Sequence, residues 1–188
     1  YTLNNTLTIS GRNYDKWKYY LSAGNQNQKG FIPNSGMNRN FLNLNSEIKF
    51  SKRFSVDISG KFTNSSSDFI PKLNSYSGIL HNMLLCPPSF EINNSAQSSY
   101  NGGISDNPNF SVMQNRMTDK NRHLILNINP EINLARNLNL VAEGSYINNN
   151  DQSLLGYANG SAVNPAGEYI EYSENMKRFL TSMTIGYT

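Results

Sequence analysis

Few side chains in this sequence have types and spacings that suggest chemistry. His81 and His123 are far apart, and neither has a Cys, Asp or Glu at the spacing of a metal-ligand set. Cys86 precedes two prolines, and the sequence places no base beside it, which favours a buried or loop thiol over a catalytic nucleophile. We therefore expect neither a metal centre nor a bound cofactor.

Two acidic segments are candidates for a calcium or sugar site. The stretch "NGGISDNPN" offers carboxylate and amide oxygens, but not at the spacing of an EF-hand loop, so a solvated turn is expected. Glu168 and Glu171 stand beside Tyr169 and Tyr172, as in a glycosidase or sugar site, but a solvated loop on a hairpin rim is the simpler interpretation. No nucleophile elbow, phosphate loop or HExxH motif occurs. The sequence therefore predicts a protein that is not an enzyme.

The composition favours strands and polar loops. Only 15% of the 188 residues are charged and 37% are hydrophobic. In place of charged and aliphatic residues the chain is rich in Asn, Ser, Thr and Tyr. The net charge of +3 comes from scattered Lys and Arg, so no nucleic-acid partner is expected. No stretch approaches the ~18 apolar residues of a membrane helix. Because the first residues already have a strand pattern, we expect a segment of a longer protein.

Hydrophobic residues recur at every second position through most of the chain, which predicts about seven β-strands. Each strand therefore has one apolar face and one polar face. The apolar face carries Leu42, Leu44, Ile48, Phe54, Val56, Ile58, Leu124, Leu126, Ile128 and Ile132. The polar face carries Asn43, Asn45, Glu47, Asp57, Lys61, Asn127, Asn129 and Glu131.

The predicted connections alternate between short and long. Short turns fall near Tyr14, Lys52 and Arg136, and longer loops near Asn34, Gly103 and Gly160, so all short turns lie at one end of the sheet. This is the layout of a transmembrane β-barrel, with long extracellular loops at about 69–120 and 158–177. A short helix over 74–85 is expected inside the first loop, ended by two prolines.

Four aromatic residues of the long loop are candidates for stacking on a sugar or contacting a lid protein. The alternative, which the sequence leaves equally open, is packing within the loop itself. The four residues are Tyr76, Phe90, Tyr100 and Phe110.

A period of two cannot separate a soluble β-sandwich from a membrane barrel, because both need alternation. Three features favour the barrel: strands of ten residues or more, mixed polar residues on the other face as in a wet lumen, and aromatics near strand ends as in interfacial girdles. The apolar face then meets lipid and the polar face the lumen. Since bacterial single-chain barrels have an even number of strands, about seven strands predict part of a larger barrel. The aromatics in question are Trp17, Tyr19, Phe50, Phe54, Phe179 and Tyr187.

Three motifs in order resemble the SusC/RagA-type TonB-dependent outer-membrane transporters. The first is "WKYYLSAGNQNQKGFIPNSGMNRNFLNLN", the second is "LLCPPSF", and the third is "DNPNF" followed by "NRHLILNINPEINLARNLNL". Two departures stand out: Leu85-Cys86 replaces a frequent arginine, and Gly24-Asn25 replaces the usual Gly-Tyr. The first motif matches at Tyr19, Tyr20, Ser22, Gly24, Gln28, Gly30, Ile32, Asn34, Ser35, Arg39, Asn40 and Asn43.

The resemblance implies the wall of a ~22-stranded barrel in the cell outer membrane of a Bacteroidota-type bacterium. Such a protein imports a nutrient, such as a glycan, oligosaccharide or peptide, with a SusD-like surface lipoprotein as lid and energy supplied through TonB. The plug domain is not among these residues. A passive outer-membrane channel, or porin, is the first alternative function, and a soluble adhesin-like β-sandwich binding module is the second.

Overall fold

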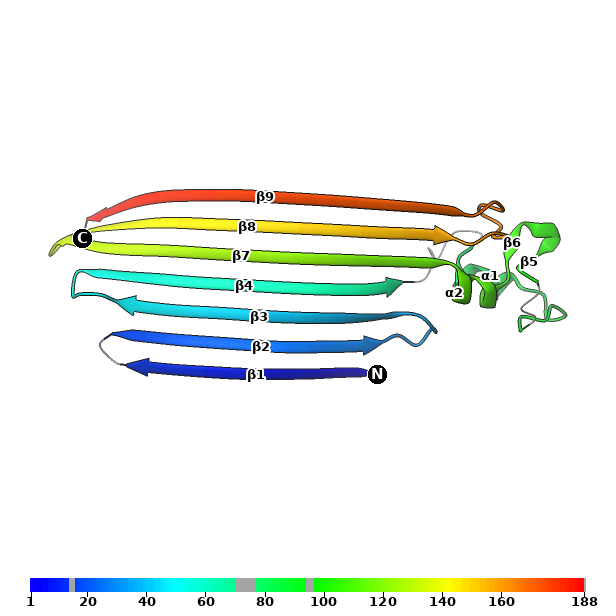
Figure 1. The fold of residues 1–188 in the computed structure, drawn as a ribbon, viewed down its shortest axis with the longest axis horizontal. Helices are drawn as coiled ribbons and strands as arrows, with labels where there is room; N and C mark the ends of the chain where they lie inside the picture. The colour runs from blue at the N-terminus through cyan, green and yellow to red at the C-terminus, as the bar shows by residue number, and fades with distance from the viewer. Residues whose placement is uncertain (14–15, 70–76, 94–96, 188) are drawn as a thin grey trace.

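The computed structural model describes residues 1–13, 16–69, 77–93 and 97–187. Its main feature is one antiparallel sheet of seven long strands lying side by side in the order β1-β2-β3-β4-β7-β8-β9 (Figure 1). The predicted all-β fold is confirmed. The strands are β1 (Thr2–Asn13), β2 (Trp17–Lys29), β3 (Gly36–Lys49), β4 (Phe54–Phe69), β7 (Arg116–Ala135), β8 (Leu138–Tyr157) and β9 (Glu168–Tyr187).

The register aligns the apolar positions of neighbouring strands. Leu44 of β3 pairs with Leu21 of β2 and Gly60 of β4, and Gly60 pairs in turn with Leu126 of β7. Because directly paired residues project on the same face of a sheet, the alternation of each strand becomes one continuous apolar face across the sheet. A slip of one residue in any pair would move that strand's apolar side chains to the polar face.

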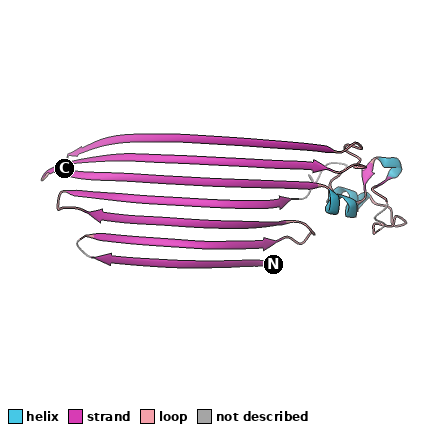
Figure 2. Cartoon of the chain, viewed as in Figure 1, coloured by secondary structure: helices cyan, strands magenta, loops and turns pink. Residues whose placement is uncertain are grey.

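The connections divide the sheet into two different ends (Figures 1 and 2). At the end that we call the turn end, consecutive strands are joined across residues 14–16, 50–53 and 136–137. At the loop end, they are joined across residues 30–35, 70–115 and 158–167. The predicted separation of short and long connections is therefore present in the structure.

The longest connection contains a small folded unit beyond the ends of β4 and β7 (Figure 1). The predicted helix is present over 79–85, and residues 74–76 lie outside the described residues. The second helix, α2, was not predicted, although Asn107 caps it by accepting a hydrogen bond from the Asn109 backbone N–H at 3.0 Å, and Pro108 opens its first turn. The unit comprises α1 (Ile79–Leu85), β5 (Ser99–Tyr100), η1 (Asn101–Gly103), β6 (Ser105–Asp106) and α2 (Pro108–Gln114).

Three strands extend further toward the loop end than the sequence pattern indicates. β9 begins at Glu168, so ten residues of the predicted second loop are strand, and β7 begins at Arg116 inside the predicted first loop. These extensions carry polar side chains on both faces, and pairing with β8, itself extended to Tyr157, holds them in place. Apolar residues occur there without regular alternation, as the adjacent Leu154 and Leu155 show, so a period-two search finds no clear pattern.

The sheet has almost no core. Among the described residues only Val56, Ile79 and Tyr100 are buried hydrophobics, and the last two belong to the small loop unit. On the apolar face Ile128 is 51% exposed and Phe179 is 76% exposed. The only other described sheet is the two-stranded β5-β6 pair, so no second layer covers the apolar face as a β-sandwich would require. No helix in the described part of the chain is long and apolar enough to cross a membrane.

Candidate functional site: a two-faced sheet with a loop platform

The apolar face forms a belt, which we define by the five rows that cross β7 at its even-numbered positions from Leu124 to Ile132. These eight residue steps correspond to ~27 Å along a strand at ~3.4 Å per residue. At a strand tilt of ~40° they would cover ~21 Å of bilayer thickness, within a few ångströms of the ~25 Å apolar band of membrane barrels. The belt therefore has the height that a lipid-facing surface needs.

Aromatic residues stand within the belt rows toward the turn end, from the middle row at Tyr19 to the last row at Phe54. The rings of Trp17 and Tyr19 lie 5.4 Å apart, and those of Phe50 and Phe54 are stacked at 5.3 Å. Phe179, by contrast, pairs with Tyr146 well inside β8 and β9, with ring centroids 4.7 Å apart. The expectation that Phe179 lies at a strand end is wrong, because β9 starts ten residues earlier than the sequence pattern indicates.

A row of amides borders the belt at the loop end. The row next to that of Leu124 has an asparagine on every strand except β7, where Arg122 stands. The Asn25 amide donates to the Asn40 carbonyl oxygen Oδ1 at 2.7 Å. On β1–β4 the face thus changes within one row from hydrocarbon to hydrogen-bonding groups, as a surface does where it leaves an apolar layer. The asparagines are Asn5, Asn25, Asn40, Asn64, Asn150 and Asn175.

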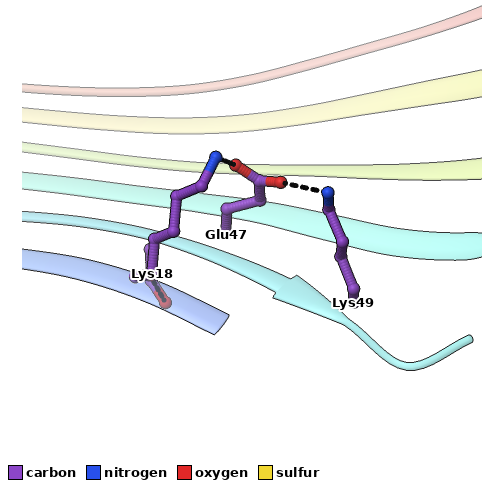
Figure 3. A network of polar contacts seen from close by, with 4 residues as sticks. Lys18, Glu47 and Lys49 are labelled. Carbon is purple, nitrogen blue, oxygen red and sulfur yellow. Dashed lines mark hydrogen bonds and ion pairs between the residues drawn. The ribbon is translucent and has the colours of Figure 1, made fainter. Parts of the chain in front are cut away.

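The opposite face of the sheet carries charged and amide side chains. Near the turn end the Lys18 ammonium lies 2.7 Å from one Glu47 carboxylate oxygen, and the Lys49 ammonium lies 3.4 Å from the other (Figure 3). All three side chains are part-exposed, so each pair contributes less than about 1 kcal/mol to stability. They form a cluster of opposite charges across two neighbouring rows of the polar face.

The register places the predicted polar residues on this same face. Asn43 pairs with Lys61, and the Asn127 amide donates to the Ser59 hydroxyl at 2.9 Å in the row that also contains Asn45. The structure therefore separates the two predicted sets by face, while the medium that each face meets stays a prediction. The remaining members of the polar set are Glu47, Asp57, Asn129 and Glu131.

A buried carboxylate joins the two longest connections at the loop end. Asp106 is fully buried and accepts hydrogen bonds from the hydroxyls of Ser77 at 2.5 Å and Ser161 at 2.9 Å. It also accepts from the Ser111 hydroxyl and the Asn115 amide, both at 3.2 Å, and from the backbone N–H of residue 162. Hydrogen bonds to a buried carboxylate offset its loss of hydration. This cluster makes one platform of residues distant in sequence.

Sequence reasoning missed the role of Asp106. The sequence pattern predicts only a solvated turn at "NGGISDNPN" and a motif match at "DNPNF", although an Asp before a capping Asn and a Pro is a local sign of a structured helix start. Its partners are more distant, with Ser77 and Ser161 lying 29 and 55 positions away. Only the folded chain could reveal these contacts.

The aromatic candidates of the long loop have different environments. Tyr100 is buried, its hydroxyl donates to the Asn82 backbone oxygen at 3.0 Å, and its ring lies 5.3 Å from that of Phe90. For Tyr100 the structure therefore favours packing within the loop over ligand contact. Phe110 is half-buried in α2, and Tyr76 lies outside the described residues. Burial raises the pKa of the Tyr100 phenol, so it remains a hydrogen-bond donor in neutral solution.

A cavity of about 550 Å³ lies at the loop end, between the β2–β3 connection and α2. Asn34 has a positive φ of 59°. Its side-chain amide donates to the Val112 backbone oxygen at 3.1 Å and thereby fixes one side of the cavity. The charged side chains that line it are Lys29, Asp68 and Arg116. The sequence did not single out this cavity, because its walls come from separate connections.

The described residues do not bring the acidic and thiol candidates into a catalytic arrangement. Glu168 and Glu171 are three positions apart in β9 and therefore project on opposite faces, so they cannot act as a carboxylate pair. The Cys86 thiol lies 3.9 Å from the Pro87 backbone oxygen. Within the described ranges no three His, Cys, Asp or Glu side chains gather as a metal site would require.

Comparisons with known proteins do not add a family. No protein-family model matches the chain, and no curated protein matches it either.

Proposed function

We propose that this chain forms part of the wall of an outer-membrane β-barrel that imports a nutrient actively. The observation that carries the proposal is the uncovered apolar belt on a single antiparallel sheet, of a height matched to a bilayer. The apolar face meets lipid and the polar face lines the lumen. The loop platform lies on the extracellular side, because long connections mark that side of bacterial barrels.

The wall requires further strands. β1 and β9 each have one side without a described partner strand, and unpaired backbone groups are not tolerated in hydrocarbon. Additional strands of the same barrel satisfy both edges. This need supports a barrel larger than seven strands, and the resemblance to SusC/RagA-type transporters suggests ~22.

Active import is supported by the three sequence motifs that resemble those transporters. A SusD-like lid is supported by α1, which overlaps the start of the second motif and carries exposed apolar side chains at the loop end. Such a surface suits a lid protein of the SusD-like type. The nutrient is a glycan, an oligosaccharide or a peptide, and the 550 Å³ cavity is a first candidate for its contact. The exposed α1 residues are Leu80, Met83, Leu84 and Leu85.

The experiment that tests import is a transport assay in the native bacterium. Deleting the full-length gene should abolish uptake of one class of nutrient, and deleting the gene for TonB should do the same. Planar-bilayer recordings of the purified full-length protein should show no open conductance, because a plug closes an active importer. Uptake that persists without TonB, together with an ohmic conductance, would establish the passive channel instead.

A soluble, adhesin-like module makes an opposite prediction. The full-length protein would then fold in buffer without detergent and bury its apolar face. We expect instead that it requires detergent or lipid, because Leu42, Ile128 and Phe179 are all exposed in one continuous face.

A further inference from the structure

Three cations lie together on the belt face, where the belt ends on β7–β9. Lys177 stands in the last belt row, with Leu124 and Asn148, and Arg122 and Lys120 occupy the next two rows. All three side chains are exposed, and none of them forms an ion pair with a described residue. Rows lie ~7 Å apart and strands ~4.8 Å apart, so the Cα atoms of Lys120 and Lys177 are ~17 Å apart with Arg122 between them, a distance that two extended lysine side chains and a phosphate group can span together.

The surrounding residues leave this positive charge uncompensated. In the same three rows the residues of β8 and β9 on this face are amides, a serine and Lys177 itself, and β4 contributes Phe62, Asn64 and Ser66. Acidic residues on this face first appear one row further out, at Asp68 and Glu171. The other acids at this level, Asp119, Asp151 and Glu174, project on the polar face instead.

An apolar hollow of about 380 Å³ lies next to the cations on the side toward the turn end. It exists because Gly60 and Gly144 have no side chains within a face of large residues. The part of the hollow nearest the cations is formed by one row, which immediately follows the row of Lys177 and contains Leu126, Tyr146 and Phe179. Its other apolar walls are Leu44, Ile58 and Ile128.

We infer that β7–β9 hold a phosphate-bearing lipid on the outside of the barrel. The phosphate lies among Lys120, Arg122 and Lys177, which donate charge-assisted hydrogen bonds to it, and one acyl chain fills the hollow. Charge complementarity selects this occupant: a second copy of the same face would bring three cations against three cations. The location at the loop end selects the outward leaflet, so the lipid is the phosphorylated glycolipid lipid A. The inference rests on the proposed orientation in the membrane.

The test compares lipid retention by the full-length protein in phosphatidylcholine nanodiscs that contain lipid A, measured by native mass spectrometry. The main variant is Lys120→Gln/Arg122→Gln/Lys177→Gln. The matched control is Arg178→Gln, which removes a cation from the same strand but from the polar face. A second variant, Gly60→Leu, fills the hollow and remains apolar, since an added Cβ there would first meet Leu126 at an ordinary 3.4 Å.

We expect the triple variant to lose lipid A by about five-fold or more for each removed cation. Gly60→Leu should also weaken retention, and Arg178→Gln should not. Retention by the triple variant equal to wild type, or an equal loss in Arg178→Gln, would overturn the inference. Nanodiscs with phosphatidylcholine and inorganic phosphate alone should leave no phosphate bound; tight binding of free phosphate would show an anion site rather than a lipid site.

Heat-modifiable mobility in gels separates this inference from the proposed function. Variants that keep the mobility shift of a folded barrel but retain wild-type lipid contradict the lipid site alone. A wild-type protein without any such shift contradicts the barrel itself.

Discussion

Replacing Ile128 by arginine tests directly which face meets lipid. Ile128 lies in the middle of the five belt rows, two rows from either edge, and is 51% exposed on that face. An arginine at the midplane of a membrane barrel costs ~2–4 kcal/mol. At 1.4 kcal/mol per factor of ten, Ile128→Arg should lower the ratio of folded to unfolded protein by ~30-fold to ~1000-fold.

Two controls isolate the contribution of lipid contact. Asn129→Arg places the same side chain on the polar face, where it stands beside Asp57 in the neighbouring strand and should cost little. Ile128→Ala removes the side-chain contacts without adding a charge. The assay is a urea titration of the full-length protein refolded into phosphatidylcholine vesicles, with heat-modifiable gel mobility as the measure of folding.

The opposite outcome would refute the orientation. If the belt face were in water, Ile128→Arg would change stability by no more than ~0.5 kcal/mol, as exposed substitutions do. Wild-type folding of Ile128→Arg together with failure of Asn129→Arg would mean that the polar face meets lipid.

Three further predictions concern the platform and the sheet. Asp106→Ala leaves several buried donors without an acceptor. It should speed protease cleavage in residues 77–115 and 158–167 without affecting the strands. Unchanged cleavage would contradict the role of the Asp106 cluster in holding these two connections together. Because burial raises the pKa of Tyr100, the protonated phenol stabilises the folded state. This stability is fully present below pH ~10, the ordinary pKa of tyrosine, and is lost as the pH rises through the raised pKa. Tyr100→Phe should remove this late tyrosinate from an ultraviolet titration and cost about 1 kcal/mol; an unchanged titration curve would contradict the assignment. Gly24→Ala would place a Cβ 2.4 Å from the Phe41 ring and 2.6 Å from the Asn5 backbone oxygen, so urea titration should show a loss of ~1–3 kcal/mol, which a wild-type midpoint would refute.

The sequence was sufficient to predict where faces and turns lie, because both depend on local patterns. Parity alone predicted that Leu42 and Asn43 lie on opposite faces of the sheet, and the two-residue turn after Ala135 was predicted between two alternating runs. The second helix was also within reach, since Asn107 and Pro108 form a standard helix start.

Other features depend on which strands pair and in what register. The asparagines at 25, 40 and 150 look like ordinary polar residues until pairing brings them into one row. The early start of β9 at Glu168 could not be predicted, because its polar residues are held by β8 rather than by a hydrophobic face. The cluster around Asp106 likewise combines segments separated by up to 55 positions.

The most direct test of the central claim is a spin-label scan along β7 in the full-length protein reconstituted into lipid. Single cysteines at residues 124–132 would be introduced after replacing Cys86 by serine, together with any cysteine of the full-length protein outside these residues. The account predicts that oxygen, which concentrates in lipid, relaxes labels at Leu124, Leu126 and Ile128, whereas a water-soluble nickel chelate relaxes those at Asn127 and Asn129. Equal accessibility of both parities to the nickel chelate, or the reverse alternation, would contradict it.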